Sequence, residues 1–204
     1  MATIPQVDVT TPTVDPGWIP APLYRMSLEQ YEAIVATGVF TKRDRFHLIK
    51  GYLVAKMTQN PPHTVADGLC GKALDRTIPD GWQVRAGNPV RLPSQISEPE
   101  PDRCVVRGDL RDYLRRHPEP ADIALIVEVS ETSLSEDRKL AQLSAAAGIP
   151  VYWIVNLVHG QVEVYTDPGP GGYGSRRIFK PGRRVPVVIA GVEVGRIRVA
   201  DILP

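Results

Sequence analysis

The chain has 204 residues, of which 43% are hydrophobic and 23% are charged, and its formal net charge is +1. These values are typical of a globular protein with one large domain or two small ones. They exclude a global attraction to nucleic acid, so DNA binding would need a local basic patch. No apolar run approaches the roughly 18 residues of a membrane span and no signal-peptide pattern is present, so we expect a cytoplasmic protein without membrane contacts.

Residues 1–26 contain five prolines and no helical period, which predicts an extended arm before a single domain over 27–204. The larger apolar side chains of this arm are expected to dock on the body or on a neighbouring subunit: Trp18, Ile19, Leu23 and Tyr24. Cys70 and Cys104 both lie in apolar contexts. They predict buried, reduced thiols, and no zinc ligands lie at a suitable spacing.

Capping signals predict two helices in the first half of the domain. Ser27 and Gln30 form a capping box, and Gly38 ends the helix that follows. Asn60 as N-cap and Pro61 at the first helical position begin a second helix. Its core-facing side chains are expected to be Val65, Leu69, Ala73 and Leu74. Between the two helices, residues 45–57 predict a β-hairpin that turns at Lys50-Gly51.

Two strand-like segments follow the second helix. Residues 82–92 are interrupted at Gly87-Asn88-Pro89, and residues 104–106 form a short apolar strand directly after Asp102. Residues 108–120 are charged and predict a solvated connection, with nucleic-acid contact as the alternative.

Residues 123–157 predict a buried strand, a helix and a second buried strand. Residues 123–130 are almost continuously apolar, as in a strand covered on both sides, and Glu128 shares one face with Ile126 and Ser130. A capping box at Ser133 predicts a helix that ends at Gly148. A strand–helix–strand unit of this length is a crossover, so we expect two parallel neighbouring strands.

The C-terminal quarter predicts a strand at 161–166, a loop at 167–174, and further strands and turns that close the domain. It also holds the only concentrated basic patch: Arg176, Arg177, Lys180, Arg183 and Arg184. These cations are candidate DNA contacts. A solvated edge hairpin, protected by charge against aggregation, explains them equally well.

Three polar residues are ambiguous singly and informative together. Asp102 alone fits a turn acid, and Glu128 alone fits a hydrogen-bonded structural acid in a buried strand. Carboxylates brought together from neighbouring strands do not both stay ionised unless a cation joins them. Oxygen ligands suit Mg²⁺ or Mn²⁺, and a nearby ammonium such as Lys139 could orient water or stabilise developing charge. The pattern predicts metal-assisted phosphodiester hydrolysis without an organic cofactor.

Four segments carry a resemblance to a known family: KMTQNPPH (56–63), EPEPD (98–102), LIVEVSETSLSEDR (125–138) and AGIPVYWIVNL (147–157). Over roughly residues 26–204 the chain resembles the Uma2 family of "putative restriction endonucleases", within the PD-(D/E)xK nuclease superfamily. The resemblance implies an α/β fold with a restriction-endonuclease-like core, a mixed β-sheet flanked by helices, and extra C-terminal hairpin strands. It also implies Mg²⁺-dependent DNA cleavage, and cutting both strands suggests a homodimer.

The resemblance implies a role for each site residue. Asp102 and Glu128 would hold the metal with the carbonyl oxygen of Val129, Lys139 would assist the attacking water, and His63 would support the metal ligands or contact phosphate. The chain departs from the family at two positions. Lys139 stands two residues after Asp137 where four is usual, and His47 replaces a Glu.

Two alternatives to a DNA endonuclease remain at this point. The departures at Lys139 and His47 favour a catalytically impaired nuclease fold that acts as a DNA- or protein-binding module. An enzyme that acts on another phosphate ester would use the same metal chemistry and differ only in the shape of its groove.

Overall fold

The computed structural model describes residues 23–41, 44–56 and 58–204. Its helices are α1 (Leu28–Ala36), α2 (Pro61–Asp75) and α3 (Leu134–Ala146), with short 3₁₀ turns at Pro93–Gln95, Leu110–Tyr113, Pro120–Asp122 and Val199–Asp201. Its strands are β1 (Phe46–Ile49), β2 (Tyr52–Ala55), β3 (Trp82–Ala86), β4 (Arg103–Arg107), β5 (Ile123–Ser130), β6 (Tyr152–Asn156), β7 (Gln161–Gly169), β8 (Gly172–Phe179), β9 (Arg184–Ile189) and β10 (Val192–Arg198). No helix of the described segments is long and apolar enough to cross a membrane.

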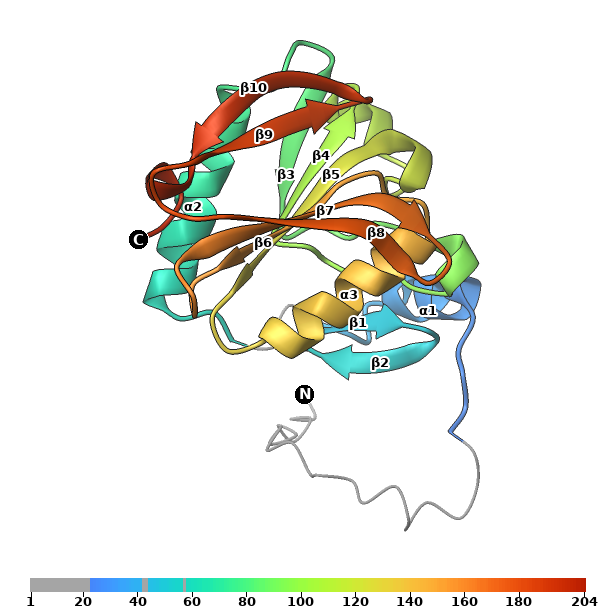
Figure 1. Cartoon of the computed structure of the whole chain (residues 1–204). Coiled ribbons are helices and arrows are strands. Elements are labelled where there is room, and N and C mark those ends of the chain that lie inside the picture. The colour runs from blue at the N-terminus through green and yellow to red at the C-terminus, as the bar shows by residue number, and fades with distance from the viewer. Residues whose placement is uncertain (1–22, 42–43, 57) are drawn as a thin grey trace.

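A six-stranded mixed sheet in the order β3-β4-β5-β6-β7-β8 forms the centre of the molecule (Figure 1). Only β5 and β6 run parallel, and every other neighbouring pair is antiparallel. The hairpins β1-β2 and β9-β10 form two separate two-stranded sheets. The predicted α/β class, the mixed sheet with flanking helices, the parallel crossover and the C-terminal hairpin strands are therefore confirmed.

The sheet is covered on both faces, which explains the unbroken apolar run of β5. Ala66, Cys70 and Leu74 of α2 pack with Val127 and with the β9-β10 hairpin on one face. Ala141 and Leu143 of α3 pack with Ile126, Tyr152 and Ile154 on the other. Every residue of β5 is buried. Because side chains alternate along a strand, Glu128 lies on the same face as Ile126, toward α3.

The first two helices begin where the capping signals predict. The Ser27–Gln30 capping box is present, and the Asn60 side chain accepts the His63 N–H at 3.3 Å. The core face of α2 is rotated from the predicted one, because Val65 is 49% exposed and Ala66 is fully buried. Gly71 on this face lies against Arg103, and a Cβ there would lie 2.8 Å from the guanidinium carbon. Cys70 and Cys104 are buried free thiols, as expected.

Two other local predictions are wrong. Ser133 makes no side-chain cap bond to the backbone of α3; its hydroxyl donates to Asp137 Oδ2 at 2.7 Å. The predicted loop at 167–174 is mostly strand, because the β7-β8 pairing extends to Gly169 opposite Gly172. The strand-like segment 82–92 breaks where predicted, because β3 ends at Ala86, directly before Gly87-Asn88-Pro89.

The predicted N-terminal arm lies largely beyond the described residues, Trp18 and Ile19 included. Leu23 and Tyr24 are 58% and 73% exposed, so these two side chains do not dock on the body as an apolar anchor. The Tyr24 hydroxyl instead exchanges hydrogen bonds with the Gln30 side chain. The boundary of the single domain stays a prediction.

Candidate functional site

Asp102 and Glu128 come together where the β4-β5 ladder ends. The last pair in this ladder joins Arg103 to Val127, so the next backbone groups have no strand partner there. Side chains take that place: the Asp102 N–H donates to Glu128 Oε2 at 3.1 Å, and the Val129 N–H donates to Asp102 Oδ2 at 2.8 Å. Each of the two predicted acids thus accepts a hydrogen bond from a backbone N–H of the other segment, and these two bonds hold the carboxylates side by side.

His63 reaches the same point from the first turn of α2. Its Nε2 lies 3.1 Å from Asp102 Oδ2, and the two side chains are only 12% and 13% exposed. A forked ion pair ties α2 to β4, with Arg103 Nε and Nη2 at 2.5 and 2.7 Å from the two carboxylate oxygens of Asp67. Asp67 is four residues after His63 and therefore on the same face of the helix. This pair places His63 against Asp102.

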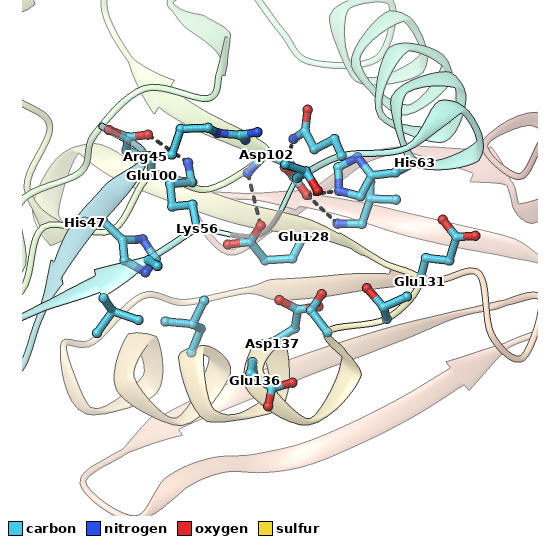
Figure 2. Close-up of a pocket in the computed structure, with 18 of the residues that line it drawn as sticks. Arg45, His47, Lys56, His63, Glu100, Asp102, Glu128, Glu131, Glu136 and Asp137 are labelled. Atoms are coloured by element: carbon cyan, nitrogen blue, oxygen red, sulfur yellow. Dashed lines mark hydrogen bonds and ion pairs between the residues drawn. The ribbon is translucent and has the colours of Figure 1, made fainter. Parts of the chain in front are cut away.

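A third buried acid, Asp137, approaches from α3. Its carboxylate accepts the Ser133 hydroxyl and its residue is 7% exposed. Burial, together with the charges of Asp102 and Glu136, raises the pKa of Asp137 to about 6. Figure 2 shows Asp137 on the side of α3 that faces Glu128. The sequence predicts Asp137 on this helix but gives it no role in the site.

The acids of the site have pKa values that move in opposite directions. Burial and the charges of Asp102 and Asp137 raise the pKa of Glu128 well above its usual range. Burial also opposes ionisation of Asp102, but hydrogen bonds from His63 and Val129 outweigh it and lower the pKa. The pKa of His63 is raised, because Asp102 outweighs the effect of burial on the imidazole. The site therefore favours an ionised Asp102 and leaves the charge of Glu128 incompletely compensated.

A lysine that no sequence pattern singled out also lines this site. Lys56, at the end of β2, donates from Nζ to Glu100 Oε2 at 2.7 Å and to the Glu100 carbonyl at 3.2 Å. Its side chain is 21% exposed, and its positive charge acts to lower the pKa of Glu128. Beside it, burial and the charge of Lys56 lower the pKa of His47 to about 4. His47 is therefore neutral at pH 7 and does not supply the negative charge of the acid that the family resemblance leads one to expect.

Lys139 lies farther along α3 in a different environment. Its side chain is exposed, and the acid whose pKa it helps to lower is Glu136. A shift of two residues turns a side chain by about 200° around a helix, and Asp137 and Lys139 accordingly differ in burial. Both residues still border the same cavity.

These groups surround one cavity of about 500 Å³ (Figure 2). The hairpin β1-β2 closes one side of it with His47, Ile49 and Val54. The opposite walls come from α2, α3 and the segment after β5. Its polar lining residues include Lys56, Gln59, Asn60, His63, Glu100, Asp102, Glu128, Glu131, Glu136, Asp137 and Lys139.

The predicted basic patch does not border this cavity. Arg176 on β8 pairs with the fully buried Glu163 at 3.0 Å, which accounts for one of its five cations structurally. Arg177 stacks over the Phe179 ring at 5.1 Å from its centre. Arg184 lines a separate cavity at the C-terminal end of α2. Arg176, Arg177 and Arg184 thus lie in three different environments.

The donor chemistry of the cavity fits a hard divalent cation that keeps part of its hydration. No three His, Cys, Asp or Glu side chains of the described residues form a ready set of metal ligands. Mg²⁺ is commonly held by one or two carboxylates, with water and substrate phosphate completing its shell. Asp102 and Glu128 supply two carboxylates, and the raised pKa of Glu128 shows the unbalanced negative charge that a cation would compensate.

Two groups of contributors were not predicted from the sequence, for different reasons. Lys56 and Glu100 lie inside the segments that carry the family resemblance, so their position was a signal that could have been used. The Asp67–Arg103 pair had only a weak signal. Asp67 follows His63 by one helical turn and Arg103 follows Asp102 directly, but nothing local shows that the two side chains meet.

Comparisons with known proteins concern the family and the fold. A crystal structure described as a "putative nuclease belonging to DUF820", from Anabaena variabilis, matches with a TM-score of 0.65 and 15% identity, over 87% of this chain and 97% of that one. At this identity the likeness concerns the fold. A search of curated proteins finds no match. The family model of Uma2, described as "Putative restriction endonuclease", matches residues 28–199, and the chain belongs to this family.

Proposed function

We propose that the protein is a Mg²⁺- or Mn²⁺-dependent DNA endonuclease that hydrolyses phosphodiester bonds. The observation that carries the proposal is the pair of carboxylates, Asp102 and Glu128, locked together across β4 and β5 in a cavity. The family description and the nuclease-like neighbour support the same class of reaction. Restriction endonucleases act on DNA, which makes DNA the proposed substrate.

Each residue of the site has a distinct task in this proposal. Asp102 and Glu128 would hold the metal, with the Val129 carbonyl, which points to the same side of β5 as the N–H bonded to Asp102. A bound Mg²⁺ polarises the phosphodiester and lowers the pKa of a coordinated water. His63 and Gln59 orient the Asp102 carboxylate, Gln59 through Nε2 at 2.9 Å from Oδ1. Lys56 offers a partly buried ammonium for the charge that develops on phosphate.

Cleavage of plasmid DNA with Asp102→Asn as the matched variant tests the proposal. We expect the wild type to nick or linearise the plasmid in 10 mM Mg²⁺ or Mn²⁺, and to lose this activity in EDTA. The Asn variant keeps the size of the side chain but removes its charge, so activity should fall by at least about 10²-fold. Equal cleavage by both proteins would indicate a contaminant and refute the assignment.

A DNA- or protein-binding module without catalysis is the second candidate. It is favoured by the exposure of Lys139 and by the neutral state of His47. A wild type that binds the plasmid but never cuts it, with either metal, would establish this alternative. If both strands are cut, the proposal includes a homodimer, and light scattering of the protein with a short duplex would report its mass.

The two lysines of the cavity should differ in their effect on cleavage. Lys56 is partly buried and acts on Glu128, whereas Lys139 is exposed and acts on Glu136. Lys56→Met should therefore lower the cleavage rate by about 10²-fold or more, and Lys139→Met by less than about tenfold. Single-turnover rates on one oligonucleotide duplex measure both.

Glu100→Gln provides the control for this comparison. It removes the carboxylate that holds Lys56 Nζ at 2.7 Å while leaving the ammonium in place. We expect an intermediate loss, with little change in melting temperature because the pair is partly solvated. If Lys139→Met instead has the larger effect, the helix lysine holds the catalytic role that the family resemblance suggests.

A further inference from the structure

A second cavity, of about 360 Å³, lies between the C-terminal half of α2 and the β9-β10 hairpin. Figure 1 shows these elements side by side, on the part of the molecule that also carries the C-terminus. The close approach depends on the bulge in β10 at Gly195, where any Cβ would lie 2.6 Å from the Thr77 methyl group. The packing of the β9-β10 hairpin against the end of α2 therefore fixes the position of the cavity walls.

The charged residues of this cavity are almost all cations. It is lined by Lys72, Arg76, Arg184, Arg196 and Arg198, with Asp201 as its single acid. Arg196 is neutralised by Glu193 at 2.6 Å. Within the described part of the chain, the other four cations make no ion pair or side-chain hydrogen bond. We call this group of four, Lys72, Arg76, Arg184 and Arg198, the basic cleft.

The pairing of like charges inside the basic cleft points to an anionic ligand. Arg184 and Arg198 are direct cross-strand partners, an arrangement that destabilises an antiparallel pair when both residues carry the same charge. Lys72 and Arg76 are one helical turn apart on α2, where like charges also repel. The C-terminal dipole of α2 favours its own two cations, but it gives no such compensation to the two arginines of the hairpin. A phosphate group between the two walls would compensate all four.

We propose that the basic cleft binds the phosphodiester backbone of DNA outside the catalytic cavity. The choice of DNA as the source of phosphate rests on the proposed function. His63 and Arg76 stand 13 residues apart along α2 and the residue that follows it, which is about 20 Å at 1.5 Å per residue. At 3.4 Å per base pair this span corresponds to about six base pairs of duplex. Arg184 is the only residue of the predicted basic patch that belongs to the basic cleft, and we place the principal phosphate contact in the cleft.

Binding of a fluorescein-labelled 20-base-pair duplex, followed by anisotropy in EDTA at several salt concentrations, tests this proposal. Arg76→Gln/Arg198→Gln removes one cation from each wall of the cleft. We expect its Kd to rise at least tenfold and the slope of log K against log[salt] to flatten by about two. Its melting temperature should match or exceed that of the wild type, because a repulsion is removed from each wall.

The matched control, Arg177→Gln/Lys180→Gln, removes the same charge from the basic patch predicted over residues 176–184, at two positions that do not line the cleft. It should keep the affinity and the salt slope close to those of the wild type. A cleft variant that binds like the wild type, or a control that loses as much affinity, would overturn the proposal. The proposal would also be overturned if inorganic phosphate stabilised the wild type and not the cleft variant while both proteins bound the duplex equally. The cleft would then hold a small anion only.

These outcomes are separate from the test of the proposed nuclease activity. A wild type that binds duplex through the cleft but never cuts it leaves the cleft assignment intact and removes the catalytic one. If the wild type cuts DNA and the cleft variant binds duplex normally, the catalytic assignment stays intact and the cleft assignment is removed.

Discussion

Glu128→Gln is expected to abolish the stabilisation of the protein by Mn²⁺ and to raise the stability of the metal-free protein. At a metal concentration 100 times its Kd, binding adds about 2.7 kcal/mol to the free energy of unfolding. For a chain of this size that is a rise in melting temperature of roughly 5–10 °C. The variant should show none of it, because one of the two charged ligands is lost, and its cleavage rate should fall to the level of Asp102→Asn.

The opposite effect without metal follows from the charges that face Glu128. Burial, Asp102 and Asp137 oppose its ionisation, and the charge of Lys56 favours it only in part. Glutamine removes the charge and keeps the shape, so at pH 8 we expect a gain of about 1 kcal/mol or more, or roughly 2–4 °C. Differential scanning calorimetry of metal-free and Mn²⁺-loaded protein measures both effects.

The pH dependence of this gain has a definite sign. A carboxyl whose pKa is raised in the folded state binds its proton more tightly when folded, so its contribution to stability falls as pH rises from the unfolded toward the folded pKa. Glu128 and Asp137 both behave in this way, and for Asp137 the window runs from the ordinary aspartate pKa of 3.8 to about 6. The Gln variant should therefore lose less stability than the wild type as pH rises from 5 to 8.

Glu136→Gln is the control for the metal experiment. Glu136 borders the same cavity from α3, but it is exposed and accepts a hydrogen bond from the Ser135 hydroxyl. It should keep the full Mn²⁺ shift. A Glu128→Gln protein that is still stabilised by Mn²⁺ to the wild-type extent would place the metal elsewhere and remove the basis of the proposed function.

The sequence predicts those parts of this fold that depend on neighbouring residues. The Ser27–Gln30 box, the Asn60-Pro61 helix start and the buried β5–α3–β6 unit are local patterns, and all are present. Ser133 shows the limit of such patterns. Its backbone, with φ −103° and ψ 17°, does not take the extended conformation of an N-cap, and its hydroxyl donates to the buried Asp137 carboxylate without capping the helix.

The candidate site could be predicted only in part, because some of its members are set by contacts between distant segments. Asp102 and Glu128 could be paired from their strand positions. Lys56 enters through the β1-β2 hairpin, whose register places His47 opposite Val54 on the side that borders the cavity. The rotation of α2 likewise depends on the tertiary Asp67–Arg103 pair, so a helical period alone misplaced Val65.

Glu163 is expected to be the most costly side chain to remove outside the cavity. Its carboxylate, 0% exposed in β7, pairs with Arg138 of α3 at 2.7 Å and with Arg176 of β8 at 3.0 Å. It also accepts hydrogen bonds from Asn156 of β6 at 2.8 Å and from the Tyr165 hydroxyl at 2.6 Å. One acid thus joins α3 to three strands of the central sheet.

Removing one partner from a buried ion pair typically costs about 3–5 kcal/mol, because the remaining charges stay buried and unpaired. Both arginines are about 40% exposed and can turn toward solvent, so we place Glu163→Ala at the lower end, near 3 kcal/mol or roughly 6–12 °C in melting temperature. Glu193→Ala, which breaks the exposed pair with Arg196 within β10, should lower the melting temperature far less. Equal losses of stability in the two variants would show that Glu163 and the side chains bonded to it, which we call the Glu163 cluster, stabilise the fold no more than an exposed ion pair does.

The Glu163 cluster should also determine the acid limit of the protein and the position of Asp137. Despite burial, hydrogen bonds from Arg138, Tyr165 and Asn156 lower the pKa of Glu163 to about 2. Its contribution is therefore fully present above the unfolded value of about 4.5 and is lost as pH falls toward 2. Glu163→Gln should flatten this acid slope in pH-dependent unfolding.

Arg138 directly follows Asp137, and adjacent residues on a helix point about 100° apart. Holding Arg138 against the sheet therefore fixes the rotation of α3 that turns Asp137 toward Glu128, so Glu163→Ala should weaken the Mn²⁺ shift although Glu163 does not border the cavity.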